Sequence, residues 1–500
     1  MKLSKEQLGR MILDYDPTNP QPEFFATATE MAATLASAAV TQPVPFPAGL
    51  APKPVAPGNP PSSQDPLPTA DVLVVTWTVA EAVALATLFT PGVPLAQWFE
   101  YTHNLDVFIP KVKGKSAPFN DPSHPRYYHS LGLYYPVQLV GKSVLCFKSG
   151  LHMDYDGPAI PILDLWNQIL DETGAKLVIT TGTGGAVGAN VLLGDVIVAG
   201  QTVFDCTTKF KNEPFKSASY DTTALANPPN TRITPDMTKP NASKLQTSNV
   251  PLHADGLPVF FYPGSAIAVP KIVTTDSFEF DDTTDSAGLQ ALGNVCDMGD
   301  ASLGLFLSTR ANPPKWAAIR NASDPQMNGN DSPAQQAKDA HSIYIAYGPF
   351  TTAASVLATW GVICGESGPA AGPHLLEAQM IAPEQSRGRL IADVKAREAQ
   401  LDPSQLLLQI AASEGFKAAA IPSDQVPPTT VAALNAYLNS ISVDPGTSDF
   451  DYRKITYTDE MKHFQRLDLI HVRNEDAEVF VGTYLYRGAD LVAKQEFVSS

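Results

Sequence analysis

Short β-branched runs alternate with segments of helical spacing in the middle of the chain. DVLVVTW begins at residue 71 and is followed by VAEAVALATLF, SVLCFKSG begins at residue 143 and is followed by PAIPILDLWNQILDETG, and KLVITTG begins a third run at residue 176. Strands that alternate with helices are typical of α/β proteins. The pattern therefore predicts an α/β fold for this part of the chain.

Changes in composition divide the chain into three predicted regions. Residues 1–68 combine helix-compatible, Ala-rich sequence with a proline-dense stretch that cannot form a regular hydrogen-bond ladder, and they are predicted to be an N-terminal helical and Pro-rich arm. Residues 69–366 are the predicted core, with insertions at 101–130 and 208–262. Residues 367–500 are predicted to be a C-terminal α+β appendage, with two helical stretches around 375–420 and a hairpin in AEVFVGTYLYRGADLVAKQEF.

Charge and hydropathy exclude several classes of function. The 500-residue chain has a net charge of −17 and 44% apolar residues. A general binder of nucleic acid or of anionic membranes needs clustered Lys and Arg, so neither partner is expected. The chain opens without a charged-then-apolar signal sequence, and no apolar run reaches membrane-spanning length. We expect a soluble, cytoplasmic protein.

The cysteines argue against a metal site. The four thiols lie far apart and form no CxxC motif: Cys146, Cys206, Cys296 and Cys364. This spacing is unsuited to zinc and is typical of buried free thiols in a reducing compartment. No metal and no cofactor is expected.

A glycine-rich run, TTGTGGAVG at 180–188, raises the question of a phosphate-binding loop. A dinucleotide fingerprint needs glycines at n, n+2 and n+5 at the start of a helix. Counting from Gly182, Gly184 fits but Val187 does not. The following LLGDVIVAG reads as a strand, so a strand–loop–strand setting is predicted, and dinucleotide oxidoreductase chemistry is disfavoured.

Four segments between residues 70 and 365 occur in an order that is similar to one known superfamily. They are TWTVAEAVAL, TTGTGGAVGANVLLGDVIVA, IVTTDSFEF, and CDMGDASLGLFL followed by WAAIRNASD. Together they resemble the purine nucleoside phosphorylase / methylthioadenosine (S-adenosylhomocysteine) nucleosidase superfamily. The resemblance implies a three-layer α/β/α sandwich around a twisted mixed sheet, a purine nucleoside or nucleotide as small-molecule substrate, and a homo-oligomer.

The resemblance assigns two catalytic carboxylates. Cleavage of an N-glycosidic bond passes through an oxocarbenium-like sugar while negative charge develops on the base, so it needs an acid at the base and a positioned nucleophile. Asp324 matches the acid at N7 of the purine, although an Asp in NASDPQ also suits a turn cap. Glu81, five residues after Thr76, matches the glutamate that activates water. A first-turn helix glutamate is the ordinary alternative, and another register would place Ala82 there.

The same resemblance implies how the substrate is held. Thr183 and the backbone of Gly182 and Gly184 would bind water and ribose in a hydrolase or phosphate in a phosphorylase. Phosphorolysis needs a cation for the incoming dianion, and Thr180 stands where one phosphorylase branch has arginine. Since the strand holds no other Arg or Lys near the loop, hydrolysis is favoured. Phosphate would be a co-substrate only in a phosphorylase.

The remaining candidates come from three other segments. Phe278 would stack on the purine and Met298 would pack under the ribose, although both also suit a plain apolar core. Gly299 stands where the superfamily has a glutamate for the ribose hydroxyls. Asp300 offers a carboxylate one position later, a rotation of about 100° on a helix. Further substrate-binding candidates are Thr76, His152, with Asp154 beside it, and Ser323.

The insertion after the first predicted helix concentrates basic residues in an acidic protein. It is either a lid over the 5′ end of the substrate or an ordinary solvated loop. Its candidates are Lys111, Lys113, Lys115, Arg126, His103, His124 and His129. The leading hypothesis is a purine nucleosidase. A phosphate-dependent phosphorylase and a non-catalytic nucleoside-binding protein remain the alternatives.

Overall fold

The computed structural model describes most of the first 366 residues and five strands near the C-terminus. The described ranges are 5–19, 41–47, 49–112, 130–153, 160–223, 225, 233–245, 249–280, 283–327, 329, 331–366, 419–420, 450–458, 465–473, 479–487 and 490–498. The chain divides into two compact units, Met1–Ala370 and Ala371–Ser500. The catalytic and substrate-binding candidates fall within the first unit. Asp154 lies outside the described residues.

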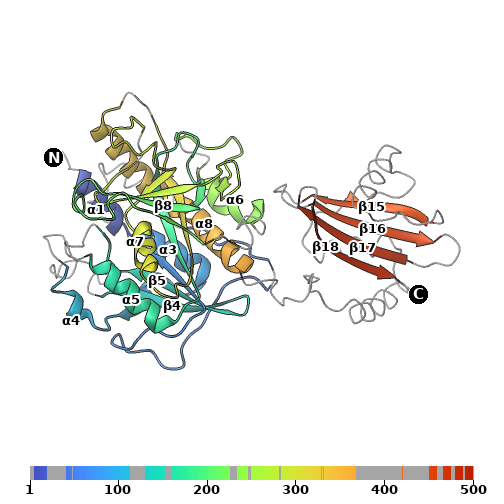
Figure 1. Cartoon of the computed structure of the whole chain (residues 1–500), viewed down its shortest axis with the longest axis horizontal. Coiled ribbons are helices and arrows are strands. Elements are labelled where there is room, and N and C mark those ends of the chain that lie inside the picture. The colour runs from blue at the N-terminus through green and yellow to red at the C-terminus, as the bar shows by residue number, and fades with distance from the viewer. Residues whose placement is uncertain are drawn as a thin grey trace. The chain divides into compact units, whose positions relative to one another are not determined.

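A mixed sheet forms the centre of the first unit (Figure 1). Its strands follow one another in the order β1 (Lys53–Pro54), β4 (Gly132–Leu139), β5 (Lys142–Ser149), β2 (Val72–Thr76), β6 (Leu177–Ala186), β12 (Val295–Asp297), β11 (Lys271–Thr275), β8 (Gln201–Asp205) and β9 (Ser219–Asp221). Outside this path, β13 (Lys315–Asp324) pairs with β6 and β7 (Val196–Val198), β10 (Phe260–Phe261) pairs with β7, and β3 (Phe99–Tyr101) pairs with β4. β2 runs parallel to β5 and β6, whereas β12 is antiparallel to β6.

Helices cover both faces of this sheet. On one face α3 (Val79–Phe89) packs on α8 (Pro333–Glu366), and on the other α5 (Pro161–Thr173) packs on α7 (Asp300–Ser308). Each face has its own apolar core: Trp360 and Trp98 are buried in the first, and Trp166 and Phe147 in the second. The predicted three-layer α/β/α arrangement is therefore confirmed. The other described helices of the unit are α1 (Lys5–Asp14), η2 (Leu95–Gln97), α4 (Leu105–Phe108) and α6 (Pro235–Leu245).

The glycine-rich run is part of a strand, which corrects the predicted strand–loop–strand setting. β6 continues through Ala186 because both of its edges are paired there. β13 runs parallel to it, with Arg320 opposite Gly182, and β12 pairs with it at Gly185 and Ala186. Backbone partners on two sides satisfy the amides that a loop would leave to solvent. The loop comes only after residue 186.

The Pro-rich stretch lies against the body of the first unit, as predicted for an extended arm. The ring of Phe46 is 5.5 Å from that of Trp360, and the indole Nε1 of Trp360 donates to the carbonyl of Leu50 at 2.7 Å. β1 adds two residues of this arm to the edge of the sheet beside β4. Proline is tolerated there because an edge strand needs hydrogen bonds on one side only.

The predicted insertion 208–262 contains regular secondary structure, namely β9, α6 and β10. α6 begins at Pro235, where the missing amide costs nothing, and it packs on α8 through Met237 and Leu245. Burial of these apolar side chains stabilises the helix.

The second unit contains a five-stranded antiparallel sheet (Figure 1). Its strands are β14 (Ala419–Ala420), β15 (Phe450–Thr458), β16 (Gln465–Arg473), β17 (Val479–Arg487) and β18 (Asp490–Val498), in that spatial order. The predicted hairpin is confirmed as β17 and β18, which pair from Phe480 with Val498 to Arg487 with Asp490. The helices predicted around 375–420 lie outside the described residues, except that Ala419–Ala420 is a strand.

Candidate functional site

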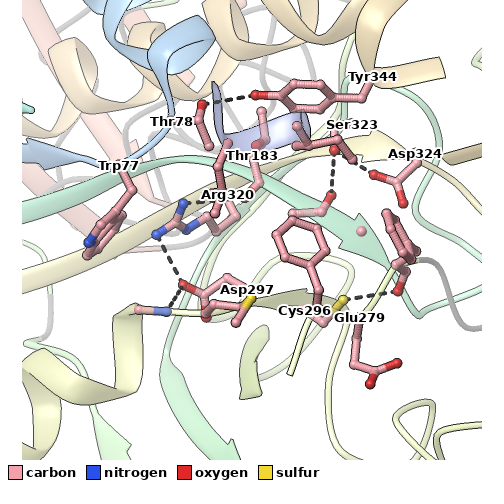
Figure 2. A pocket seen from close by; sticks show the side chains of 18 of the residues that line it. Trp77, Thr78, Thr183, Glu279, Cys296, Asp297, Arg320, Ser323, Asp324 and Tyr344 are labelled. Carbon is pink, nitrogen blue, oxygen red and sulfur yellow. Dashed lines mark hydrogen bonds and ion pairs between the residues drawn. The ribbon is translucent and has the colours of Figure 1, made fainter. Parts of the chain in front are cut away.

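One pocket is lined by both predicted catalytic carboxylates, Glu81 and Asp324, and by residues from eight segments of the first unit in all. Figure 2 shows Asp324 and other residues of this lining. The cavity volume is about 70 Å³, within about 550 Å³ of space between atoms that includes open solvent. The lining consists of Ile12, Leu13, Trp77, Thr78, Glu81, His152, Thr183, Gly184, Gly185, Phe278, Glu279, Phe280, Cys296, Asp297, Met298, Gly299, Arg320, Ser323, Asp324 and Tyr344. Segments more than 240 residues apart in sequence thus meet at one cavity.

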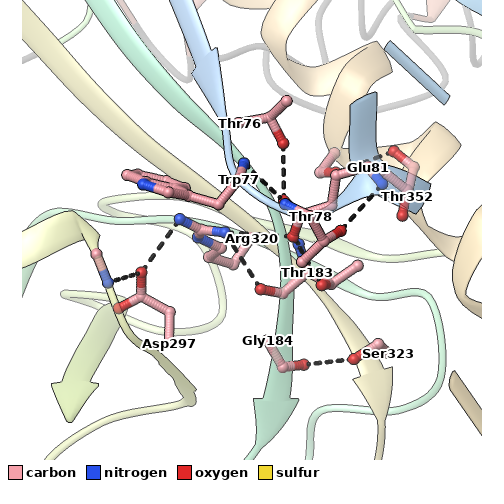
Figure 3. A network of polar contacts seen from close by, with 12 residues as sticks. Thr76, Trp77, Thr78, Glu81, Thr183, Gly184, Asp297, Arg320, Ser323 and Thr352 are labelled. Carbon is pink, nitrogen blue, oxygen red and sulfur yellow. Dashed lines mark hydrogen bonds and ion pairs between the residues drawn. The ribbon is translucent and has the colours of Figure 1, made fainter. Parts of the chain in front are cut away.

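Glu81 is held by the turn between β2 and α3 (Figure 3). Thr78 caps the helix, and its side-chain hydroxyl oxygen accepts a hydrogen bond from the Glu81 amide. In return, the Glu81 carboxylate accepts hydrogen bonds from the amides of Trp77 and Thr78. The Thr76 hydroxyl donates to Oε2 at 2.7 Å. On the other oxygen, the amide and hydroxyl of Thr183 donate at 2.7 and 2.8 Å. This ring of donors fixes the carboxylate. Thr183 also lines the pocket, whereas Thr76, which was predicted to bind substrate, does not line it and contacts Glu81 instead.

These donors keep Glu81 ionised. Burial raises the pKa of Glu81, but the Arg320 guanidinium and the amides of Thr183 and Thr78 outweigh burial, so the pKa lies below its ordinary value. Arg320 Nη1 lies 3.5 Å from Oε1. Glu81 therefore brings a fixed negative charge to the pocket.

Arg320 is the main residue that the sequence analysis missed, and it overturns the premise that no cation lies near the glycine run. It belongs to β13, directly opposite Gly182 of β6. Its guanidinium is 3% exposed and contacts three carboxylates: Asp300 at 2.7 and 2.8 Å, Asp297 at 3.1 Å and Glu81 at 3.5 Å. The sequence did offer one signal for this residue, a single arginine within the strand sequence KWAAIRNASD. Because arginine is rarely buried without partners, an arginine in such a strand predicts acidic neighbours.

Asp297 and Asp300 share Arg320 but differ in their position. Asp300 is fully buried in a bidentate pair with Arg320 and does not reach the pocket, so it is not available for the sugar. Asp297, which was not among the candidates, does line the pocket. It accepts from the Thr274 hydroxyl at 2.6 Å and from the amides of Gly299 and Asp300 at 2.9 Å. Burial and the neighbouring Asp300 carboxylate raise the pKa of Asp297 to about 7, against the opposing effect of Arg320.

Asp324 lies at the opposite end of the view in Figure 2 from Trp77. It ends β13 and is mostly buried, and the Ser323 hydroxyl lies 2.6 Å from its Oδ1. Phe278 lines the same pocket from the segment after β11, not from within a strand, and its ring is 5.4 Å from that of Phe280. Asp324 and Phe278, the two residues that the resemblance predicted at the purine, thus line the same pocket.

Two glycines allow these groups to approach one another. A Cβ at Gly182 would overlap the Glu81 carboxylate and lie 2.7 Å from Arg320 Nη1. A Cβ at Gly184 would lie 2.7 Å from the carbonyl of Cys296 on β12. The predicted importance of both positions therefore has a steric reason, although Gly184 lines the pocket and Gly182 does not.

Trp77 occupies the space beside Gly299. A Cβ at Gly299 would lie 2.8 Å from Cζ2 of the indole. The guanidinium of Arg320 lies 4.8 Å from the ring centroid of Trp77, and Trp166 meets that ring edge-on at 6.2 Å. The side chain missing at residue 299 is thus replaced in space by an aromatic ring from another segment.

The remaining candidates divide between the pocket and its surroundings. Met298 and His152 line the pocket. The described part of the 101–130 insertion does not line it: His103 pairs with Glu172 and Lys111 with Asp164, both on α5. Its other basic candidates lie outside the described residues: Lys113, Lys115, His124, Arg126 and His129.

Helix α1 contributes to the pocket, which the sequence analysis did not foresee. Ile12 and Leu13 line it. Leu8 and Ile12 pack with Phe280 and Tyr344 in one apolar cluster. The backbone of Gly9 lies so close to the Phe278 ring that a Cβ there would overlap it. The N-terminal segment therefore belongs to the site as well as to the arm.

Several general features of the described residues concern metals, thiols and membranes. Within the described ranges, no group of His, Cys, Asp and Glu is arranged to hold a metal ion. All four cysteines are buried and free, as predicted. Each described helix is too short or too polar to cross a bilayer.

Known proteins resemble this chain in structure rather than in sequence. No protein-family model and no curated protein matches it. Futalosine hydrolase of Helicobacter pylori is 12% identical, with a TM-score of 0.35, over 58% of this chain and 96% of its own. The 5′-methylthioadenosine/S-adenosylhomocysteine nucleosidase of Neisseria meningitidis, in complex with methylthio-immucillin-A, is 17% identical, with a TM-score of 0.32, over 59% and 98%.

A third similar structure is a putative 5′-methylthioadenosine/S-adenosylhomocysteine nucleosidase from Borrelia burgdorferi B31 bound to adenine. It is 13% identical, with a TM-score of 0.34, over 58% of this chain and 98% of its own. Since a fold does not carry a reaction with it, the activity has to be argued from the pocket residues.

Proposed function

We propose that this chain is a nucleosidase that hydrolyses the N-glycosidic bond of a purine nucleoside or nucleotide to the free base and the sugar. The observation that carries the proposal is that Glu81 and Asp324, from different segments, line one pocket. A purine between Phe278 and Asp324 would direct its sugar toward Glu81 and Arg320. The reaction needs negative charge beside the sugar and a proton donor beside the base, and Glu81 and Asp324 would supply them.

At the sugar end, Glu81 stabilises positive charge. As the bond to the base breaks, the sugar becomes oxocarbenium-like, and the fixed carboxylate lies in a site where charges act strongly. The Thr183 hydroxyl donates to Glu81 Oε1 and keeps lone pairs for the hydrogen of a water molecule. Water adds to the anomeric carbon, and its proton passes through Thr183 to Glu81.

At the base end, Asp324 acts as the acid. The electrons of the broken bond move to the purine, and Asp324 transfers a proton to N7 of the leaving base. One water molecule is consumed, and the products are the protonated, neutral base and the free sugar. The Ser323 hydroxyl, 2.6 Å from Oδ1, fixes the orientation of the carboxyl group.

The charge balance around Arg320 favours water over phosphate as nucleophile. Phosphorolysis would bring a dianion beside Thr183. Two buried cations lie near Glu81, and both already face carboxylates of the protein. Arg320 is surrounded by Glu81, Asp297 and Asp300, and the Lys148 ammonium interacts with Asp14 and Glu81. A phosphate dianion beside Thr183 would therefore compete with these carboxylates for the same cations in a buried site.

The test is release of base from adenosine, inosine, methylthioadenosine and AMP, with and without phosphate. We expect release without phosphate, and a loss of about 100- to 10,000-fold in kcat for Asp324→Asn. Asp106→Asn, at an exposed position on α4, serves as the control and should keep full activity. Strict dependence on phosphate would make the enzyme a phosphorylase. Binding without turnover in the whole panel would favour a nucleoside-binding protein.

A further inference from the structure

Beside Trp77, the pocket wall has no free space for a side chain at residue 299. Trp77 lies between Arg320, 4.8 Å from its ring centroid, and Gly299, where a Cβ would lie 2.8 Å from the ring. Figure 3 shows the indole beside the guanidinium, on the side of Arg320 away from Ser323. A side chain larger than hydrogen at residue 299 therefore requires Trp77 to move. The Trp77 ring can therefore occupy this position because residue 299 has no side chain.

The carboxylates at this end of the pocket are already occupied. Glu81 accepts three hydrogen bonds on Oε2, and on Oε1 it accepts two from Thr183 and faces Arg320. Asp297 accepts from Thr274 on Oδ1, and on Oδ2 from two amides and Arg320. A carboxylate oxygen offers about two lone-pair positions. By this count Glu81 has none left and Asp297 has about one, on Oδ1, so the two groups together can accept one further sugar hydroxyl but not two.

A vicinal diol needs such capacity. Two adjacent hydroxyl groups donate two hydrogen bonds, and one free carboxylate is the side chain best suited to accept both. Besides the polar side chains that line the pocket, such as Thr183 and Asp297, the sugar would meet the edge of Trp77, the thioether of Met298 and the hydrogen of Gly299. These three apolar surfaces favour C–H groups, and a hydroxyl placed against them would lose its bonds to water without replacement.

We propose that Trp77, together with Gly299, selects nucleosides whose sugar lacks the 2′,3′-diol, that is, 2′-deoxyribonucleosides. This inference rests on the proposed function for the orientation of the substrate, with the base at Asp324 and the sugar at Glu81. It assigns to Trp77 a role in specificity and to Gly299 the role of making room for the ring. The expected preference for the deoxy sugar is about 10- to 100-fold in kcat/KM.

The experiment compares kcat/KM for 2′-deoxyadenosine with adenosine, and for 2′-deoxyinosine with inosine, using the full chain. The wild type should prefer the deoxy member of each pair. The double variant Trp77→Ala/Gly299→Glu should lower or reverse that ratio, because it removes the ring and adds a free carboxylate. Trp316→Phe, a buried tryptophan outside the pocket lining, is the matched control and should leave the ratio unchanged.

The outcomes separate this inference from the proposed function. Base release with equal or greater efficiency from the ribonucleosides overturns the specificity inference and leaves the nucleosidase intact. If no nucleoside is cleaved, the proposed function fails, and calorimetric binding decides the inference. Tighter binding of 2′-deoxyadenosine than of adenosine supports it, and equal binding overturns it. If the double variant does not fold, the wild-type ratios alone decide in the same way.

Discussion

The two ends of the pocket are built differently. At the Trp77 end, Glu81, Asp297, Asp300 and Arg320 form a buried network in which every charged group has several partners. At the Asp324 end, aromatic rings, a serine and a mostly buried carboxyl group line the cavity. The first end is fixed by electrostatics inside the fold, whereas the second relies on shape and stacking. We therefore expect substitutions at the Trp77 end to change mainly the stability, and substitutions at the Asp324 end to change mainly substrate recognition.

This contrast follows from where the residues come from. The charged end lies where β2, β6, β12 and β13 meet the first turns of α3 and α7, and these neighbouring strands are held by pairing in one sheet. The other end combines the last residues of β13 with the segment after β11 and with helices α1 and α8. Groups placed by paired strands keep their geometry when a ligand is absent, which is the condition for preorganised charge.

The largest effect is expected from Arg320→Met. The change leaves three buried carboxylates without their cation, which should lower the free energy of unfolding by about 3–5 kcal/mol. Urea unfolding of Arg320→Met and of Arg310→Met measures the difference. Arg310 pairs with Asp171 at the surface, so its loss should cost less than about 1 kcal/mol. Equal losses in the two variants would mean that the buried network does not stabilise the fold.

The second effect is steric. Gly182→Ala places a methyl group against the Glu81 carboxylate and Arg320, and both are locked by hydrogen bonds. We expect a loss of about 1–3 kcal/mol in stability, measured by chemical unfolding, from the overpacking. Gly58→Ala, where a Cβ meets no atom within 4 Å, is the control. An unchanged stability for Gly182→Ala would show that Glu81 can shift freely.

The third effect is a pH dependence that involves a single proton. Burial and the Asp300 carboxylate raise the pKa of Asp297 to about 7 from an ordinary 3.8, so between these values the folded chain holds a proton that the unfolded chain has lost. Its contribution to stability should therefore fall as pH rises from roughly 4 to 7 and level off above 7. Thermal unfolding of the wild type and Asp297→Asn across this range gives the contribution by difference. Parallel curves for the two proteins would contradict it.

The smallest effect on stability is expected at the Asp324 end of the pocket. Phe278→Leu removes stacking from a partly exposed ring, so KM should rise about two- to tenfold, while stability changes by less than about 1 kcal/mol. Phe99→Leu, at a partly buried ring on β3 outside the pocket lining, should leave KM unchanged. Steady-state kinetics and unfolding on both variants test the separation. A large loss of stability in Phe278→Leu would place this residue in the structural core.

Local sequence was sufficient for the elements and for part of the site. The alternation of β-branched runs with helical segments predicted β2, α3, β5, α5 and β6, because hydrophobic period and length are properties of the sequence itself. The motif order also brought Glu81, Thr183 and Asp324 forward as candidates, and these three line one pocket.

Other features depended on which strands became neighbours. Arg320 sits in an apolar run, and its importance appears only when β13 pairs with β6 and brings it opposite Gly182. Asp300 was a candidate one position after the motif's glutamate, yet its carboxylate pairs with Arg320 and does not line the pocket. The role of Gly299 likewise depends on Trp77, more than 200 residues earlier in the chain.

The amino-acid sequence alone determined the fold class, the Pro-rich arm and the residue types available for N-glycosidic chemistry. Tertiary structure alone decided which of those residues share a pocket, which carboxylates are already occupied, and which aromatic ring fills the space beside a glycine. The physical reason is the distance along the chain over which each kind of interaction acts. Helical and strand periods and turn residues act over a few positions, whereas the pairing of charges and the exclusion of volume depend on distances that only the assembled sheet sets.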